Sequence, residues 1–103
     1  MTHIIEDRLP QIVALCRRHH VRRLELFGSA TGDGFRPDAS DFDSLVEIAP
    51  LSPADHADSY FGLLHGLEDL FALQVDLLER GPIRNPYLFT SIDENKVVLY
   101  EAA

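Results

Sequence analysis

The sequence has little cysteine, no long apolar run and few basic residues. Cys16 is the only cysteine among the 103 residues, which excludes an internal disulfide and any multi-cysteine metal site. No apolar stretch approaches the ~20 residues of a membrane span, so we expect no membrane partner. Residues 1–20 lack the basic start and apolar stretch of a signal peptide. A lone cysteine fits a reducing cytoplasm, where we expect the protein to act, with Cys16 in its core.

Because basic residues are few, the chain is strongly acidic. Lys and Arg number 9 against 17 Asp and Glu, so the formal net charge is −8. A field of this sign repels phosphodiester backbones and disfavours direct nucleic-acid binding. It does not exclude a nucleotide, because bound Mg²⁺ can reverse the local sign. It also suits a basic protein partner, and a homo-oligomer is compatible with it.

The length and patterning predict one domain over residues 1–103, because this length suits a single core and no repeat or linker interrupts it. Seven segments show helical or alternating periodicity. In chain order they are a helix over 4–19, strands over 21–28 and 41–49, a helix over 51–72, a strand over 73–79, a short helix over 85–95 and an extended end over 96–101. This order predicts an α/β (α+β) fold with a small mixed sheet and helices packed mainly on one face.

Three local signals refine these helices. Pro10 is tolerated only in a first turn, so the stable part of the first helix is expected to begin near Leu9. His19 and His20 are expected to end it, where a cationic imidazole is favourable. Ser52 is the expected N-cap of the helix over 51–72. No histidine shows the spacing of a metal ligand set.

Two aspartates lie one residue apart where the second strand begins. Side chains alternate along a strand, so Asp41 and Asp43 point one way and Phe42 points the other, as a core anchor. Their Cα atoms would lie about 6.6–6.8 Å apart. Two carboxylates so placed can share one hard cation or bridge two, and Mg²⁺ prefers oxygen ligands while leaving positions for substrate phosphate.

An anion site and a third carboxylate accompany this pair. Gly28 allows backbone amides to approach a bulky anion, and the Ser29 hydroxyl can donate to a phosphate oxygen. Asp76 lies in the strand over 73–79 and would join Asp41 and Asp43 if that strand neighbours the second one. Three acidic groups and two metal ions suit in-line attack on a nucleotide α-phosphate, with Asp76 as base for the incoming hydroxyl. The alternative is a solvated strand end beside an ordinary turn.

In order, these residues resemble the nucleotidyltransferase superfamily that includes DNA polymerase beta. The matching set is Gly28-Ser29, a variable loop "ATGDGFRPDAS", Ser40, Asp41-Phe42-Asp43 and the later strand aspartate Asp76. The resemblance covers roughly residues 10 to 101, and the short length is similar to the minimal nucleotidyltransferase branch. It implies two Mg²⁺ ions and ATP as substrate, with Ser40 joining the nucleotide site. Members of this branch often serve as antitoxins of helical HEPN-type ribonuclease toxins, and some transfer AMP to a toxin tyrosine.

One departure from the family pattern keeps a second hypothesis open. The family often carries a basic residue shortly after the Gly-Ser, where this chain reads "ATGDG" and adds Asp33. Arg36 is the candidate to supply the missing positive charge from within the loop. The alternative function is therefore a non-catalytic antitoxin that neutralises a HEPN toxin by binding. A small-molecule nucleotidyltransferase ranks lower, because those usually carry a second domain.

Overall fold

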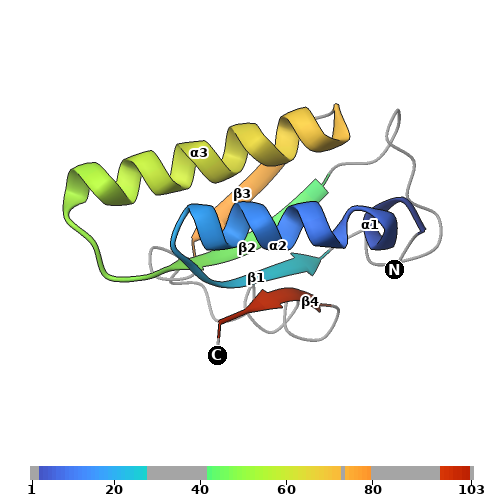
Figure 1. Ribbon diagram of the computed structural model, residues 1–103, viewed down its shortest axis with the longest axis horizontal. Coiled ribbons are helices and arrows are strands. Elements are labelled where there is room, and N and C mark those ends of the chain that lie inside the picture. The colour runs from blue at the N-terminus through green and yellow to red at the C-terminus, as the bar shows by residue number, and fades with distance from the viewer. Residues whose placement is uncertain (1–2, 28–41, 73, 80–95, 103) are drawn as a thin grey trace.

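The computed structural model describes residues 3–27, 42–72, 74–79 and 96–102. The elements in chain order are α1 (His3–Asp7), α2 (Leu9–Arg18), β1 (Val21–Phe27), β2 (Phe42–Ile48), α3 (Pro53–Phe71), β3 (Val75–Glu79) and β4 (Val97–Glu101). Figure 1 shows two layers, with α2 and α3 lying across a sheet. The short helix expected over 85–95 and the loop over 29–40 fall outside the described residues.

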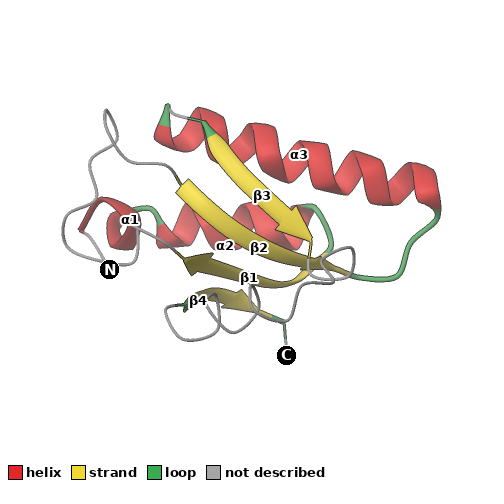
Figure 2. Cartoon of the chain, turned by 180° about the vertical axis from the view of Figure 1, so that it is seen from behind, coloured by secondary structure: helices red, strands yellow, loops and turns green. Residues whose placement is uncertain are grey.

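Within the described residues, the sheet is mixed and has four strands in the order β3-β2-β1-β4. Strand β1 runs antiparallel to both β2 and β4, whereas β2 and β3 run parallel and are joined through α3. In Figure 2 the sheet lies in front and the helices behind it, so the helices cover one face. The predicted fold class, a small mixed sheet with helices on one face, is confirmed.

The first helical segment is divided into α1 and α2. Arg8 separates them with φ −100° and ψ 0°, and its amide donates to the Ile5 carbonyl at 3.1 Å. Pro10 is the second residue of α2 and has no N–H, so it cannot continue the ladder of an unbroken helix. The expected start near Leu9 is confirmed, while the single helix over 4–19 is wrong.

Helix α3 begins as the sequence predicted. The Ser52 side chain accepts a hydrogen bond from the Asp55 amide at 3.2 Å, and Pro53 is the first helical residue. Its C-terminus is less ordinary, because Ala72 adopts the left-handed conformation with φ 54°. Among the described residues, no helix is long and apolar enough to cross a membrane.

The core lies between the helix layer and the covered face of the sheet. Cys16 and Phe42 are fully buried there, as predicted, and Phe42 stacks on Phe71 with ring centroids 5.0 Å apart. Among the described residues, the other fully buried apolar side chains are Ile5, Ile12, Leu24, Leu26, Val46, Leu63 and Leu67. Phe42 is the first residue of β2 and its side chain points into this core, so the side chain of the next residue must face the other way.

Candidate functional site

Asp43 and Asp76 are partners across two parallel strands. Asp43 of β2 lies opposite Asp76 of β3, one residue after the pair formed by Phe42 and Val75. Neighbouring strands are ~4.8 Å apart, so the two aspartates are separated by one strand spacing. Phe42 and Val75 are buried under the helices, whereas Asp43 is half-buried and Asp76 exposed. Alternation therefore places both carboxylates on the face that the helices leave uncovered. The adjacency of the two strands, which the sequence left open, is met in the structure.

The register that pairs Asp76 with Asp43 continues from β2 into β1, which gives a row of three paired residues across the sheet. Phe27, the last residue of β1, pairs with Asp43 in the antiparallel register. In sequence, Gly28 follows Phe27 and Asp41 precedes Phe42, so both predicted motifs are continuous with this end of the row. Five predicted site residues nevertheless lie outside the described part of the chain: Gly28, Ser29, Arg36, Ser40 and Asp41.

The chemistry of the described pair suits a hard cation. Two carboxylates one strand spacing apart repel each other, and a shared cation offsets that repulsion. Oxygen ligands of this kind suit Mg²⁺, which uses one or two carboxylates together with substrate phosphates. Within the residues that the structure describes, no group of three or more His, Cys, Asp or Glu is arranged to hold a metal. Asp43 and Asp76 would thus be two of the metal ligands, with the third expected ligand, Asp41, outside these residues.

Three hydrogen bonds hold the backbone around Asp76. The Ser44 Oγ donates to the Asp76 carbonyl at 3.1 Å, and the Tyr60 hydroxyl donates to the Leu77 carbonyl at 2.5 Å. The Val75 amide donates to Glu68 Oε2 at 3.4 Å. Sequence reasoning missed these residues. Ser44 carried a signal, because a polar residue stood at a strand position that alternation assigns to the core.

A second polar cluster lies where α3 meets the end of β3. His56 Nε2 is hydrogen-bonded to Glu79 Oε1, so this imidazole has a carboxylate partner. Burial raises the pKa of the Tyr60 phenol, and the negative charges of Glu79 and Asp76 raise it further. The Tyr60 hydroxyl therefore stays protonated at neutral pH and remains a hydrogen-bond donor.

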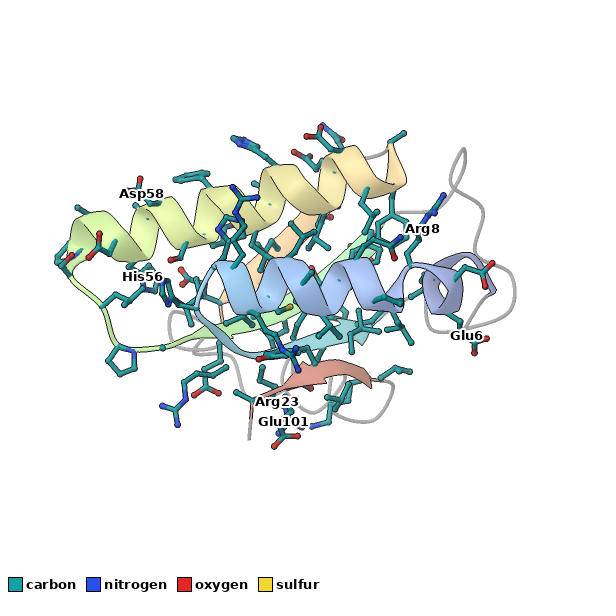
Figure 3. All side chains as sticks on the ribbon, viewed as in Figure 1. Glu6, Arg8, Arg23, His56, Asp58 and Glu101 are labelled. Carbon is teal, nitrogen blue, oxygen red and sulfur yellow. The ribbon has the colours of Figure 1, made fainter. Side chains whose placement is uncertain are left out.

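A third cluster lies where β1 meets β4 and contains Glu25. Its side chain is only 3% exposed and forms two ion pairs, from Oε1 to Arg23 Nε at 2.9 Å and from Oε2 to Lys96 Nζ at 3.4 Å. Arg23 also reaches Glu101 at 3.7 Å, and Figure 3 shows these two side chains together below the sheet. Two cations already neutralise Glu25, so it is poorly suited to serve as a further metal ligand.

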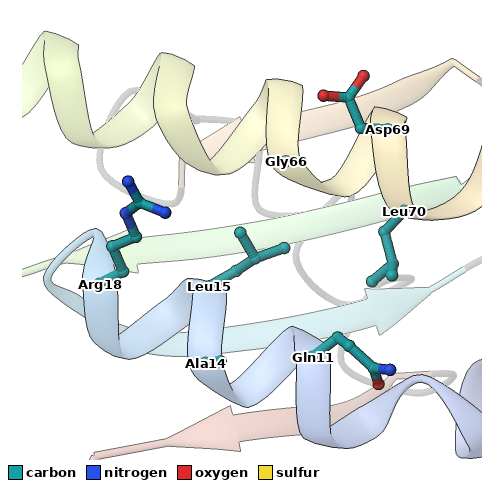
Figure 4. A pocket seen from close by; sticks show the side chains of 7 residues that line it. All are labelled: Gln11, Ala14, Leu15, Arg18, Gly66, Asp69 and Leu70. Atoms are coloured by element: carbon teal, nitrogen blue, oxygen red, sulfur yellow. The ribbon is translucent and has the colours of Figure 1, made fainter.

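A groove between α2 and α3 lies on the helical side of the molecule (Figure 4). Gly66 lets the two helices approach closely, since a Cβ added there would lie 2.6 Å from the Leu15 side chain. The apolar Leu15 side chain therefore packs against the glycine. The residues that line the groove are Gln11, Ala14, Leu15, Arg18, Gly66, Asp69 and Leu70. It lies on the covered side of the sheet, away from the face of the two aspartates. The candidate site is therefore the edge of the open face at Asp43 and Asp76.

Comparison with known proteins adds three findings. Residues 11–99 match the family model described as nucleotidyltransferase domain. An inferred protein adenylyltransferase of Methanocaldococcus jannaschii is 34% identical over 83 residues, which cover 81% of each chain. The structure of an inferred minimal nucleotidyltransferase superposes with a TM-score of 0.66 at 26% identity, covering 90% of both chains.

A further solved structure shares the fold at lower identity. It contains a tri-AMPylated HEPN toxin of Shewanella oneidensis in complex with an MNT antitoxin. The TM-score is 0.64 at 19% identity, over 94% of this chain and 72% of that one. The chain thus shares sequence with the family model and the relative, and it shares its fold with the two solved structures.

Proposed function

This chain belongs to the nucleotidyltransferase domain family, of the minimal type, and on that premise we propose that it is an Mg²⁺-dependent protein adenylyltransferase. Its substrate would be ATP, and its acceptor a tyrosine of a HEPN toxin that it silences as an antitoxin. The tri-AMPylated toxin bound to a fold neighbour supports this choice of partner. The lone cysteine supports action in the cytoplasm. The observation that carries the proposal is the register of Asp43 with Asp76 on the open face.

Each predicted residue has a role in the proposed transfer. Asp41 and Asp43 would hold the metal ions, with Gly28, Ser29, Ser40 and Arg36 holding the nucleotide. When bound, the ions supply positive charge for the triphosphate and for the attacking oxygen. Asp76 would complete the ligand set and accept the proton of the tyrosine hydroxyl. The new bond joins the tyrosine oxygen to the α-phosphorus, the bond from that phosphorus to the bridging oxygen breaks, and pyrophosphate leaves.

The open face explains why a partner protein would be needed. Asp76 is exposed and lies on β3, an edge strand of the sheet. Nothing in the described helix layer covers the face on which it lies (Figure 2). An acceptor protein can therefore approach the two aspartates directly, and its surface would exclude the water that competes with the tyrosine. The net charge of −8 would favour an acceptor with a basic surface.

Substitution of Asp43 tests the proposal. With α-labelled ATP and a co-expressed HEPN toxin, we expect Asp43→Asn to lower label transfer at least about 100-fold, because a metal ligand is lost. Glu47→Gln is the matched control, since Glu47 is an exposed acid on the same strand and face. Transfer that is unchanged in Asp43→Asn, or reduced equally in Glu47→Gln, would contradict the assignment.

The loop sequence favours a second candidate function. No basic residue follows Gly28-Ser29 directly, and Asp33 adds negative charge, so a neutralising antitoxin that acts by binding alone is the alternative. Calorimetry with ATP and Mg²⁺ separates the two functions. Micromolar ATP binding supports the enzyme. Absence of binding, together with full toxin neutralisation by an Asp41→Asn/Asp43→Asn double variant, supports the binding antitoxin.

A further inference from the structure

We propose that Tyr60 and Ser44 are positioning residues, whose hydroxyls hold the backbone of β3 so that the Asp76 carboxylate stays beside Asp43. The inference rests on the proposed function, because it assigns these hydroxyls to the same metal site. The Ser44 hydroxyl donates to the Asp76 carbonyl, and the Tyr60 hydroxyl donates to the Leu77 carbonyl. Neither residue touches the substrate in this proposal; both act through Asp76.

Strand β3 needs such support because of its place in the sheet. It has five residues and, among the strands that the structure describes, lies at the edge with β2 as its neighbour. Successive carbonyls of a strand point in opposite directions, so the carbonyls of Asp76 and Leu77 leave the backbone on different sides. Ser44 takes the first from β2 and Tyr60 takes the second from α3. The two hydroxyls therefore bracket Asp76 and limit its movement relative to Asp43.

The two donors come from rigid elements. Ser44 is fully buried on β2, directly after Asp43, and a buried hydroxyl is costly unless it is hydrogen-bonded. Tyr60 is half-buried on α3, a helix of 19 residues that packs along the sheet. Glu68, two turns further along α3, accepts from the Val75 amide at 3.4 Å. Helix α3 thus holds β3 on both sides of Asp76, at Val75 and at Leu77.

Kinetics of conservative variants test the proposal. Tyr60→Phe and Ser44→Ala each remove one hydroxyl, and Tyr100→Phe is the control, because it removes a hydroxyl from β4 at the other edge of the sheet. We expect the first two to lower kcat for AMP transfer and to raise the Mg²⁺ concentration at half-saturation, each about 10-fold. At saturating Mg²⁺ the KM for ATP should stay unchanged, because the predicted nucleotide ligands are untouched. Tyr100→Phe should alter neither quantity.

A direct measurement of metal affinity tests the positioning role independently of AMP transfer. Mn²⁺ affinity is measured calorimetrically on each variant, and we expect it to be about 10-fold weaker in Tyr60→Phe and Ser44→Ala. Tyr60 is only half-buried whereas Ser44 is fully buried, so Tyr60→Phe remains usable if Ser44→Ala fails to fold. Lower thermal stability with unchanged Mg²⁺ half-saturation, kcat and Mn²⁺ affinity would overturn the positioning role while leaving the proposed function standing. A wild type that neither transfers AMP nor binds Mn²⁺ would overturn both.

Discussion

His19 ends α2 and packs its imidazole against α3. A Cβ added at Gly62 would lie 2.4 Å from the His19 Cε1, so the ring occupies the space that the glycine leaves. Burial lowers the pKa of His19 from its ordinary 6.5, and the charges of Arg18 and His20 lower it further. The helix end was predicted correctly, but the expected benefit of a cationic imidazole there was wrong for His19, because packing favours the neutral form.

At the residue scale, this pKa predicts a pH dependence. The unfolded chain binds the proton more readily than the folded one between the lowered pKa and 6.5. The contribution of His19 to stability should therefore be complete above 6.5 and fall as the pH drops through the lowered pKa. Urea unfolding from about pH 5 to about pH 8 should show the stability difference between wild type and His19→Gln growing with pH. His65→Gln, at an exposed position of α3, is the control, and a difference independent of pH would contradict the prediction.

At the scale of elements, the connection from α3 to β3 carries strain at Ala72. This exposed residue has φ 54°, a left-handed conformation that costs an alanine roughly 1–2 kcal/mol and a glycine almost nothing. The same turn leads directly to Val75 and Asp76. The conformation of Ala72 therefore bears both on the stability of α3 and on the position of β3, which carries Asp76.

A pair of glycine substitutions tests this account of the α3 terminus. Ala72→Gly should raise the free energy of unfolding by about 0.5–1 kcal/mol, because it relieves the left-handed alanine. Ala14→Gly, at an exposed position inside α2, should lower it by about 1 kcal/mol. Chemical denaturation measures both. Two changes of the same sign would show that the Ala72 conformation is not the source of strain.

At the scale of the whole molecule, one core joins the helices of the described residues to the sheet. Cys16 is fully buried in that core, and burial raises the pKa of its thiol to about 12. The thiolate, which is the reactive form, is thus almost absent in the folded protein near neutral pH.

Cys16 should therefore report on global unfolding. We expect a thiol reagent at about pH 8 to modify it only as fast as the chain opens, and urea to accelerate labelling in step with the loss of helical circular dichroism. Ala14→Gly should speed labelling, because it lowers global stability. Rapid modification of the native protein, independent of urea, would contradict the burial of this residue.

The fold was largely predictable because its signals are local. Alternation and apolar, branched residues located the strands β1, β2 and β3 within two residues, and β4 was expected as a short extended end. Ser52 with Pro53 located the start of α3. The division between α1 and α2 was missed because the apolar pattern continues across Arg8, while the proline that breaks the hydrogen-bond ladder was interpreted only as a late start. At the candidate site, residue type and strand position were enough to select Asp43 and Asp76, which the structure pairs in register.

The sequence by itself determined which face of each strand the candidate side chains occupy, because residue order dictates alternation along a strand. Only the tertiary structure decided that β3 lies parallel beside β2, in the register that pairs Asp43 with Asp76. It likewise decided that Ser44 and Tyr60 hold the backbone beside Asp76. Such contacts join residues 17 and 32 positions apart in the chain, and pairing at that distance depends on how whole elements pack.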